Sequence, residues 1–318
     1  MSKFNNLFTY MGSKITMLPH LINDKILPEK GDILVEPFMG SCALILNTDY
    51  NKYYMNDLNK YIYDFTNILL TIDLEQLDAN YNKLLEKFHY DGTDEAIKQE
   101  KKDFFYKVRG MYFDNYDKLD DLKKASLFCF LAYNGFSGKP INTSLSCGQI
   151  NRKKHLRMDI YKAFQAKKDK IVLANLDYKD FIKEVLKYEK EEDITLYLDP
   201  PYVDSFKYQK SNDLDGFVND IKKLYTEHDF LITIQSNFKN AEIMRLYKDY
   251  NIIEVDRKLN VQAGSDDTQT KTEVIIVKDD RYHPTRQFEL NILINWLTLK
   301  DYDPKIIQYY KRELKNVK

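Results

Sequence analysis

Apolar residues recur along this chain in two alternating patterns, which predict strands and helices in turn. Short apolar runs that are typical of buried strands occupy positions 32–35, 53–57, 170–175, 194–198 and 230–235. Apolar residues spaced three and four apart, as in helices, occupy 43–47, 58–70, 179–188, 213–228 and the stretch from Ala241. Such alternation is typical of a largely parallel sheet with helices packed on it, so we expect an α/β fold.

Residues 74–133 interrupt this alternation. The segment is long and charged, and its apolar residues keep helical spacing, which predicts an inserted helical subdomain with 125–133 as its core helix. We therefore divide the chain into a sheet domain, an inserted helical and basic subdomain, and a helical C-terminal extension. Their expected bounds are 1–73 with 171–284, 74–170, and 285–318.

Two late apolar runs predict the far edge of the sheet. They occupy 252–256 and 273–277, and the polar segment 262–270, which contains Gly264, joins them. Successive strands joined by a loop of this length pair in antiparallel fashion. We therefore expect a mixed sheet whose last two strands form an antiparallel edge.

The composition is that of a globular protein of a reducing compartment. Apolar residues make up 43% of the chain and charged residues 31%, which argues against disorder. Cys42, Cys129 and Cys147 form no C-x-x-C pair, so no disulfide framework is expected, and the five histidines form no zinc-ligand cluster. No apolar run has the length of a signal peptide core or a membrane span. We expect a soluble cytoplasmic protein that uses no metal and no membrane.

Positive charge is concentrated in one segment of an otherwise balanced chain. Lys and Arg number 48 against 49 Asp and Glu, but residues 134–170 hold nine Lys or Arg and two Asp or Glu, an excess of seven positive charges. Such a patch is the electrostatic pattern of a phosphate-backbone contact, although a charged segment is more often a solvated helix face. The candidate contacts to nucleic acid are Asn134, Lys139, Arg152, Lys153, Lys154 and Arg157.

The strand 194–198 runs into Asp199-Pro200-Pro201-Tyr202. The prolines remove two amide donors, which leaves the Asp199 carboxylate and the Pro200 carbonyl as acceptors beside an aromatic ring. Such a corner can hold a planar base with an amino group: the two oxygens accept its hydrogens while Tyr202 stacks on its face. Because the carboxyl ends of strands carry the ligand site in open α/β sheets, we expect a nucleobase site here.

Three earlier segments carry the residue types of a nucleotide-like site. Lys14, close after Gly12 at an expected helix start, can attract an anion such as a carboxylate. The strand 32–35 runs into Glu36-Pro37-Phe38-Met39-Gly40, a turn that allows backbone amides to approach a ligand. Asp57 ends the next strand 17 residues after Gly40. It either accepts from ribose hydroxyls or caps the helix expected at 58–70.

These segments together, in this order, resemble the Dam-type, alpha-class DNA adenine-N6 methyltransferases, from about Phe8 to Val277. Tyr10 to Lys14 is similar to that family's first S-adenosylmethionine motif, 35–40 to its glycine motif, and Asn56-Asp57 to its ribose-binding acid. Asp177-Tyr178 is similar to its adenine-ring motif and Asp199 to Tyr202 to its catalytic tetrapeptide. Ser236-Asn237 and Glu273 to Ile276 match later structural motifs.

The resemblance implies a Rossmann-like methyltransferase sheet with an inserted helical DNA-recognition subdomain. It implies transfer of a methyl group from S-adenosylmethionine to N6 of a flipped adenine in double-stranded DNA, by direct displacement. Asp199, Pro200 and Tyr202 would be catalytic. The cofactor would be bound by Tyr10, Lys14, Glu36, Phe38, Gly40, Asp57, Asp177, Tyr178 and Asp199.

Two departures from the family pattern limit what carries over. Cys42 stands where the family usually has a second glycine, and the segment after Asn134-Gly135 lacks the residues associated with GATC readers. The target sequence is therefore open, as is a cognate restriction endonuclease as partner. Transfer to N4 of cytosine or to RNA, and a catalytically silent DNA-binding protein, are the alternatives.

Overall fold

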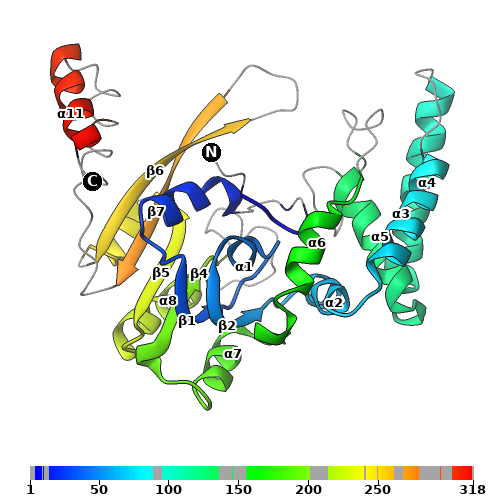
Figure 1. The fold of residues 1–318 in the computed structure, drawn as a ribbon, viewed down its shortest axis with the longest axis horizontal. Coiled ribbons are helices and arrows are strands. Elements are labelled where there is room, and N and C mark those ends of the chain that lie inside the picture. The colour runs from blue at the N-terminus through cyan, green and yellow to red at the C-terminus, as the bar shows by residue number, and fades with distance from the viewer. Residues whose placement is uncertain are drawn as a thin grey trace.

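A mixed seven-stranded sheet forms the centre of the part of the chain that the structure describes (Figure 1). The computed structural model describes residues 4–8, 10, 14–88, 95–135, 145, 155–200, 214–239, 241–248, 250–260, 268–278, 294 and 303–316. Its strands are β1 (Lys30–Glu36), β2 (Asp49–Asn56), β3 (Ile171–Ala174), β4 (Ile194–Leu198), β5 (Ile232–Phe238), β6 (Asn251–Asn260) and β7 (Thr268–Lys278).

The strand order places the ends of β1 and β4 side by side. The order is β3-β2-β1-β4-β5-β7-β6, with the first five strands parallel. The chain moves outward from β1 in one direction and from β4 in the other, so loops leaving these two strands diverge and open a crevice at their carboxyl ends. β7 is antiparallel to both β5 and β6. The α/β fold and the antiparallel edge predicted from the sequence are confirmed.

Helices cover both faces of this sheet. Strand residues alternate between two buried clusters: Leu34 packs in one with α1 (Ala43–Asn47) and α2 (Lys60–Leu69), and Ile33 and Val35 pack in the other. The second cluster contains residues of α7 (Tyr178–Val185) and α8 (Leu214–Glu227), and Ile243 of α9 (Ala241–Leu246). Because both faces are covered at the centre of the sheet, every residue of β4 is buried.

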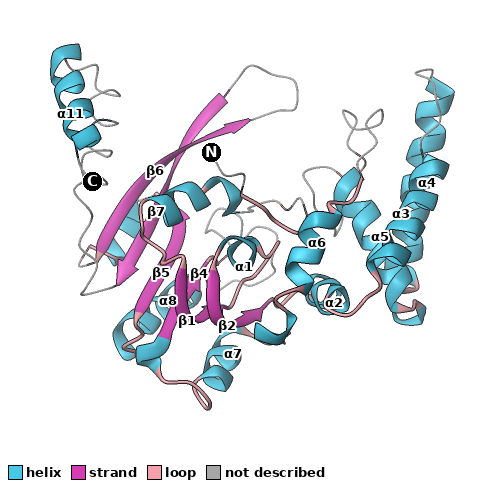
Figure 2. Ribbon diagram, in the orientation of Figure 1, coloured by secondary structure: helices cyan, strands magenta, loops and turns pink. Residues whose placement is uncertain are grey.

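The helical interruption predicted for 74–133 is present as three helices. They are α3 (Leu74–Phe88), α4 (Glu95–Asp114) and α5 (Asp121–Asn134), which stand together beyond α2 and α6 (Met158–Gln165) in Figure 2. Their core is continuous with that of the sheet, since Phe128 of α5 stacks on Phe65 of α2 at 4.2 Å between ring centroids. Whether 74–170 is a separate subdomain stays a prediction.

The helix expected to start near Lys14 is replaced by two short turns, whereas the C-terminal extension contains a helix as expected. The amphipathic stretch 15–26 does not form one helix: a 3-10 turn at Lys14–Thr16 is followed by a π-helical turn at Pro19–Asn23. Pro19 has no amide hydrogen to continue a regular helix begun before it. In the C-terminal extension the structure describes α11 (Pro304–Asn316), which lies on the opposite side of the view from α3 to α5 (Figure 1).

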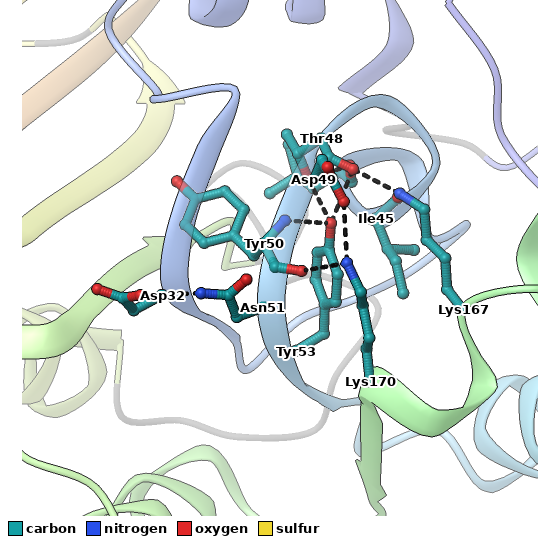
Figure 3. Close-up of polar contacts among 10 residues, drawn as sticks. Asp32, Ile45, Thr48, Asp49, Tyr50, Asn51, Tyr53, Lys167 and Lys170 are labelled. Carbon is teal, nitrogen blue, oxygen red and sulfur yellow. Dashed lines mark hydrogen bonds and ion pairs between the residues drawn. The ribbon is translucent and has the colours of Figure 1, made fainter.

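Two lysines after α6 fix this segment to the start of β2 (Figure 3). The ammonium of Lys167 donates to the carbonyls of Ile45 and Thr48, at 2.6 and 2.5 Å, where α1 ends. A cation there also complements the negative end of the helix dipole. Lys170 pairs with Asp49 at 3.0 Å. This cluster lies at the amino end of a parallel strand, away from the crevice.

We expect Lys167→Met to destabilise the fold by about 1–3 kcal/mol, because two carbonyls lose their shared donor while the apolar stem is kept. The measurement is urea-induced unfolding, and Lys168→Met, at an exposed neighbouring position, is the matched control. Equal stabilities of the two variants would contradict this role.

Candidate active site

Three acidic residues meet where β1, β2 and β4 end. Glu36 is the last residue of β1, Asp57 follows β2, and Asp199 follows β4. Glu36 is buried, and its pKa is raised well above the ordinary value, first by burial and then by the charges of Asp199 and Asp57. These three acidic side chains, each named from the sequence, are therefore close enough for their charges to interact.

Lys14 from the N-terminal segment lies among these carboxylates. Its ammonium is 2.9 Å from Oδ1 of Asp199 and 3.8 Å from Oε2 of Glu273 on β7, and its side chain is 6% exposed. The sequence predicted that Lys14 attracts an anion at a helix start. The structure places it at the start of a 3-10 turn and between two carboxylates of the protein, one of which is the predicted catalytic aspartate.

Asp57 organises the turn that follows β1. Its carboxylate accepts hydrogen bonds from the backbone amides of Gly40 at 3.1 Å and Asn59 at 2.9 Å. The alternative role of Asp57 as a helix cap is wrong, because α2 starts after Asn59, whose own side chain accepts from the amide of Tyr61. Burial raises the pKa of Asp57 to about 6, against the lowering effect of the two amides.

The turn itself needs unusual backbone angles. Gly40 has a φ of 48°, and a β-carbon there would meet the ring of Tyr10 at 3.4 Å. Cys42 has a φ of 57°, in the left-handed region that favours glycine. This geometry gives a physical reason for the glycine that the family usually has at this position. Here a buried cysteine adopts the same conformation, with Sγ 3.8 Å from Oγ1 of Thr66.

Two further predicted residues, Phe38 and Tyr178, have aromatic rings in contact with each other. The rings of Phe38 and Tyr178 are 5.5 Å apart and tilted by 35°. Asp177 is exposed, and its side chain caps α7 by accepting from the amide of Lys179 at 2.9 Å. Asp177 therefore has a structural partner in addition to any ligand that it binds.

Sequence reasoning did not identify the central part that Asn56 plays in this site. Its side chain is buried, donates to the carbonyls of Pro37 and Leu176, each at 3.0 Å, and accepts from the amide of Leu176 at 2.9 Å. It thereby joins the loops after β1, β2 and β3. The sequence did carry one signal for this role: Asn56 is an amide side chain at the end of a strand, directly before Asp57.

Tyr10 and Pro200 complete the described part of the site. Burial, followed by the charges of Asp57 and Asp199, raises the pKa of Tyr10, so its hydroxyl stays protonated and can donate. Pro200 is buried directly after Asp199. Tyr202 lies outside the described residues.

Two of the predicted DNA contacts, Asn134 and Arg157, lie among the residues that the structure describes. Asn134 is fully buried at the end of α5, where its amide donates to the Phe130 carbonyl at 2.9 Å, so its position does not support a direct base contact. Arg157 is half-buried and pairs with Asp159 at 3.0 Å. Lys139, Arg152, Lys153 and Lys154 lie outside the described residues.

Neither a metal site nor a membrane span is found in the part of the chain that the structure describes. There, no group of three or more His, Cys, Asp or Glu side chains could hold a metal ion. Among the same residues, no helix is both long and apolar enough to cross a bilayer.

A family of known proteins and two of the relatives below match this chain over most of its length. The family described as D12 class N6 adenine-specific DNA methyltransferase matches residues 10–261. The retron Ec67 DNA adenine methylase of Escherichia coli is 27% identical over 293 residues, 87% of this chain and 92% of that protein. The type II methyltransferase M1.LlaDCHI of Lactococcus lactis subsp. cremoris is 22% identical over 84% of this chain and 93% of that protein. The DNA adenine methylase of Salmonella typhi is 27% identical over 43% of this chain and 44% of that protein.

Proposed function

Because this chain belongs to the D12 class N6 adenine-specific DNA methyltransferases and is thus an enzyme that methylates N6 of adenine in DNA, we propose that S-adenosylmethionine is its methyl donor and double-stranded DNA its substrate. We propose further that it acts at specific sites and that Asp199 orients the target amino group. The observation that carries this proposal is the cluster of Glu36, Asp57 and Asp199 with Lys14 at the carboxyl ends of adjacent parallel strands.

The charges of this cluster fit S-adenosylmethionine. Carboxylates outnumber the ammonium of Lys14 there, which favours a ligand that carries positive charge on a sulfonium and an amino group. Oε2 of Glu36 is buried and has no hydrogen-bond partner among the described residues, so it can accept from a bound amine. Lys14 would bind the cofactor carboxylate and Asp57 its ribose hydroxyls. Asp177 would accept from its adenine amine, while Phe38 and Tyr178 would contact the ring.

When bound, S-adenosylmethionine supplies an electrophilic methyl group. The protein must make adenine N6 nucleophilic, because its lone pair is delocalised into the ring. Acceptance of the two N6 hydrogens by Asp199 and the Pro200 carbonyl would favour a tetrahedral nitrogen whose lone pair points away from the ring. Asp199 thus acts by orientation rather than as a strong base.

The target adenine must leave the duplex to reach these acceptors. Unstacking costs a few kcal/mol, and the ring of Tyr202 would offset part of this cost by stacking on the flipped base. The basic segment that includes Arg152, Lys153 and Lys154 would bind the phosphates on either side.

The experiment that tests this function is incubation with methyl-labelled S-adenosylmethionine and unmethylated double-stranded DNA, followed by nucleoside mass spectrometry. We expect labelled N6-methyladenine, and sequencing of the same DNA identifies the target site. Labelled N4-methylcytosine, label in RNA only, or no labelled nucleoside despite cofactor binding would each contradict the proposal in favour of one of the alternatives.

The pKa of Asp57 predicts a pH dependence of cofactor binding. With a pKa of about 6, Asp57 is protonated below that pH and loses its charge as an acceptor. Affinity for S-adenosylmethionine should therefore fall about tenfold from pH 7 to pH 5, since each pH unit below the pKa lowers the ionised fraction by about tenfold. The measurement is isothermal titration calorimetry across this range.

The same raised pKa predicts the opposite pH dependence for the contribution of Asp57 to folding stability. The folded pKa lies above the ordinary 3.8, so this group stabilises the fold at low pH and that stability is lost as pH rises through about 6.

The variant Asp57→Asn tests the role of Asp57 in cofactor binding. It should bind the cofactor more weakly than the wild type, and its affinity should not change between pH 7 and pH 5. An unchanged pH profile in this variant would contradict the assignment.

A restriction endonuclease as partner stays a prediction. It is supported by the type II name of the Lactococcus protein, whereas the Escherichia coli protein is named as a retron methylase. The DNA substrate supports action in the cytoplasm of a bacterial or phage-infected cell. Protection of methylated DNA against endonucleases that cut at the identified site would test the partnership.

A further inference from the structure

Glu273 is a fully buried carboxylate directly before an apolar run of β7. It lies on β7, paired in register with Phe238 of β5 and Val255 of β6, and is 0% exposed. It is followed by Val274, Ile275, Ile276 and Val277. It also lies beyond residues 10–261, which the family description matches. Because burying a charge is costly unless it is paired, a cation near this side chain matters for its role.

Among the described residues, the ammonium of Lys14 provides a counter-charge close to this carboxylate. Oε2 of Glu273 is 3.8 Å from this nitrogen, which also lies 2.9 Å from Oδ1 of Asp199. Lys14 belongs to the N-terminal turn, Asp199 to the end of β4 and Glu273 to the antiparallel part of the sheet. One buried cation thus connects the catalytic aspartate to a strand that does not contribute to the end of the parallel sheet.

We propose that Glu273 is a positioning residue for methyl transfer, which acts on Asp199 through Lys14. This inference rests on the proposed role of Asp199 as acceptor of the adenine amino hydrogens. A lysine side chain has four rotatable bonds, so a single ion pair restrains it poorly. A second anion on a rigid strand restricts the ammonium to one place, and the ammonium in turn restrains the carboxylate of Asp199. Orientation of this carboxylate is what the reaction requires.

The central test is Glu273→Gln, which keeps the shape of the side chain and removes its charge. We expect kcat on DNA to fall about tenfold while KM for S-adenosylmethionine changes less than about twofold, because the loss is one of orientation rather than of binding. The matched control is Glu254→Gln, on the adjacent strand β6, where the carboxylate is 46% exposed and pairs with Lys239 at 2.7 Å. This control should have wild-type kcat. Rates are expressed per cofactor-binding molecule, so that a misfolded fraction does not count as lost turnover.

A double-mutant cycle with Lys14→Gln separates positioning from a purely structural role. If Glu273 acts through Lys14, adding Glu273→Gln to the Lys14→Gln background should change kcat less than about twofold. Glu273→Asp keeps the charge and should retain more turnover than Glu273→Gln. If Glu273→Gln does not fold, the same cycle is run with Glu273→Asp, whose loss of turnover should likewise disappear in the Lys14→Gln background.

Three results would overturn the inference: wild-type kcat in the Glu273 variants, an undiminished loss in the Lys14→Gln background, or equal turnover of the Asp and Gln variants. They would leave the proposed function intact as long as the wild-type protein forms N6-methyladenine. Failure of the wild-type protein to do so would overturn that function instead.

Discussion

Asp199→Ala should lower the rate of adenine methylation about 10³-fold and leave affinity for S-adenosylmethionine within a few fold of wild type. The rate falls because removing one preorganised hydrogen-bonding partner of a reacting group costs about 10²- to 10³-fold, and Asp199 also orients the base. Binding persists because Lys14 keeps an ion-pair partner in Glu273, 3.8 Å away. The measurements are single-turnover methylation of a duplex that contains the target site and calorimetric binding of the cofactor.

Asp199→Asn is the matched control for shape. Its amide fits the same space and keeps one acceptor oxygen, but it carries no negative charge. We expect its rate to lie between those of the wild type and the alanine variant. Turnover of Asp199→Ala within tenfold of wild type would exclude Asp199 as the acceptor. An equal loss of cofactor affinity and of rate would mean that Asp199 acts through cofactor binding and not by orienting the base.

Reversing the charges of Arg152, Lys153 and Lys154 to glutamate should weaken DNA binding about 10²- to 10³-fold at 0.1 M salt. Each phosphate contact contributes about 0.9 to the slope of log K against log salt, so three lost contacts flatten this slope by about 2.7. The measurement is fluorescence anisotropy with a labelled duplex at several salt concentrations. Cofactor affinity should not change, because these residues are not among those expected to bind the cofactor.

A matched triple reversal controls for net charge. Lys183, Lys187 and Lys190 are exposed and lie between the second half of α7 and the amino end of β4, away from the carboxyl ends of the strands. Their reversal to glutamate adds the same charge but should leave the salt slope within about 0.5 of wild type. Similar slopes for the two triple variants would mean that the basic segment is a solvated surface rather than a phosphate contact.

Much of the fold follows from local pattern in the sequence. The strand at Ile194–Leu198 was predicted with its bounds, since a fully buried strand is a continuous apolar run between polar neighbours. β2 was predicted only in part: it begins at Asp49, four residues before the expected start at 53. Its first residues are mostly polar and partly exposed, and they pair with Lys30 and Gly31 through backbone atoms that side-chain patterns do not report.

The sequence alone also predicted that three acidic side chains stand at the ends of strands. Glu36, Asp57 and Asp199 each end a parallel strand or directly follow one, and such ends lie at one edge of a sheet. The partners of these side chains depended on tertiary structure. Lys14 is brought from the N-terminal turn and Glu273 from the antiparallel strand β7, and Asn56 donates to the carbonyl of Leu176, 120 residues away. Burial removes water as a competing partner, so each polar group must pair with whatever group the fold brings within reach, however distant in sequence.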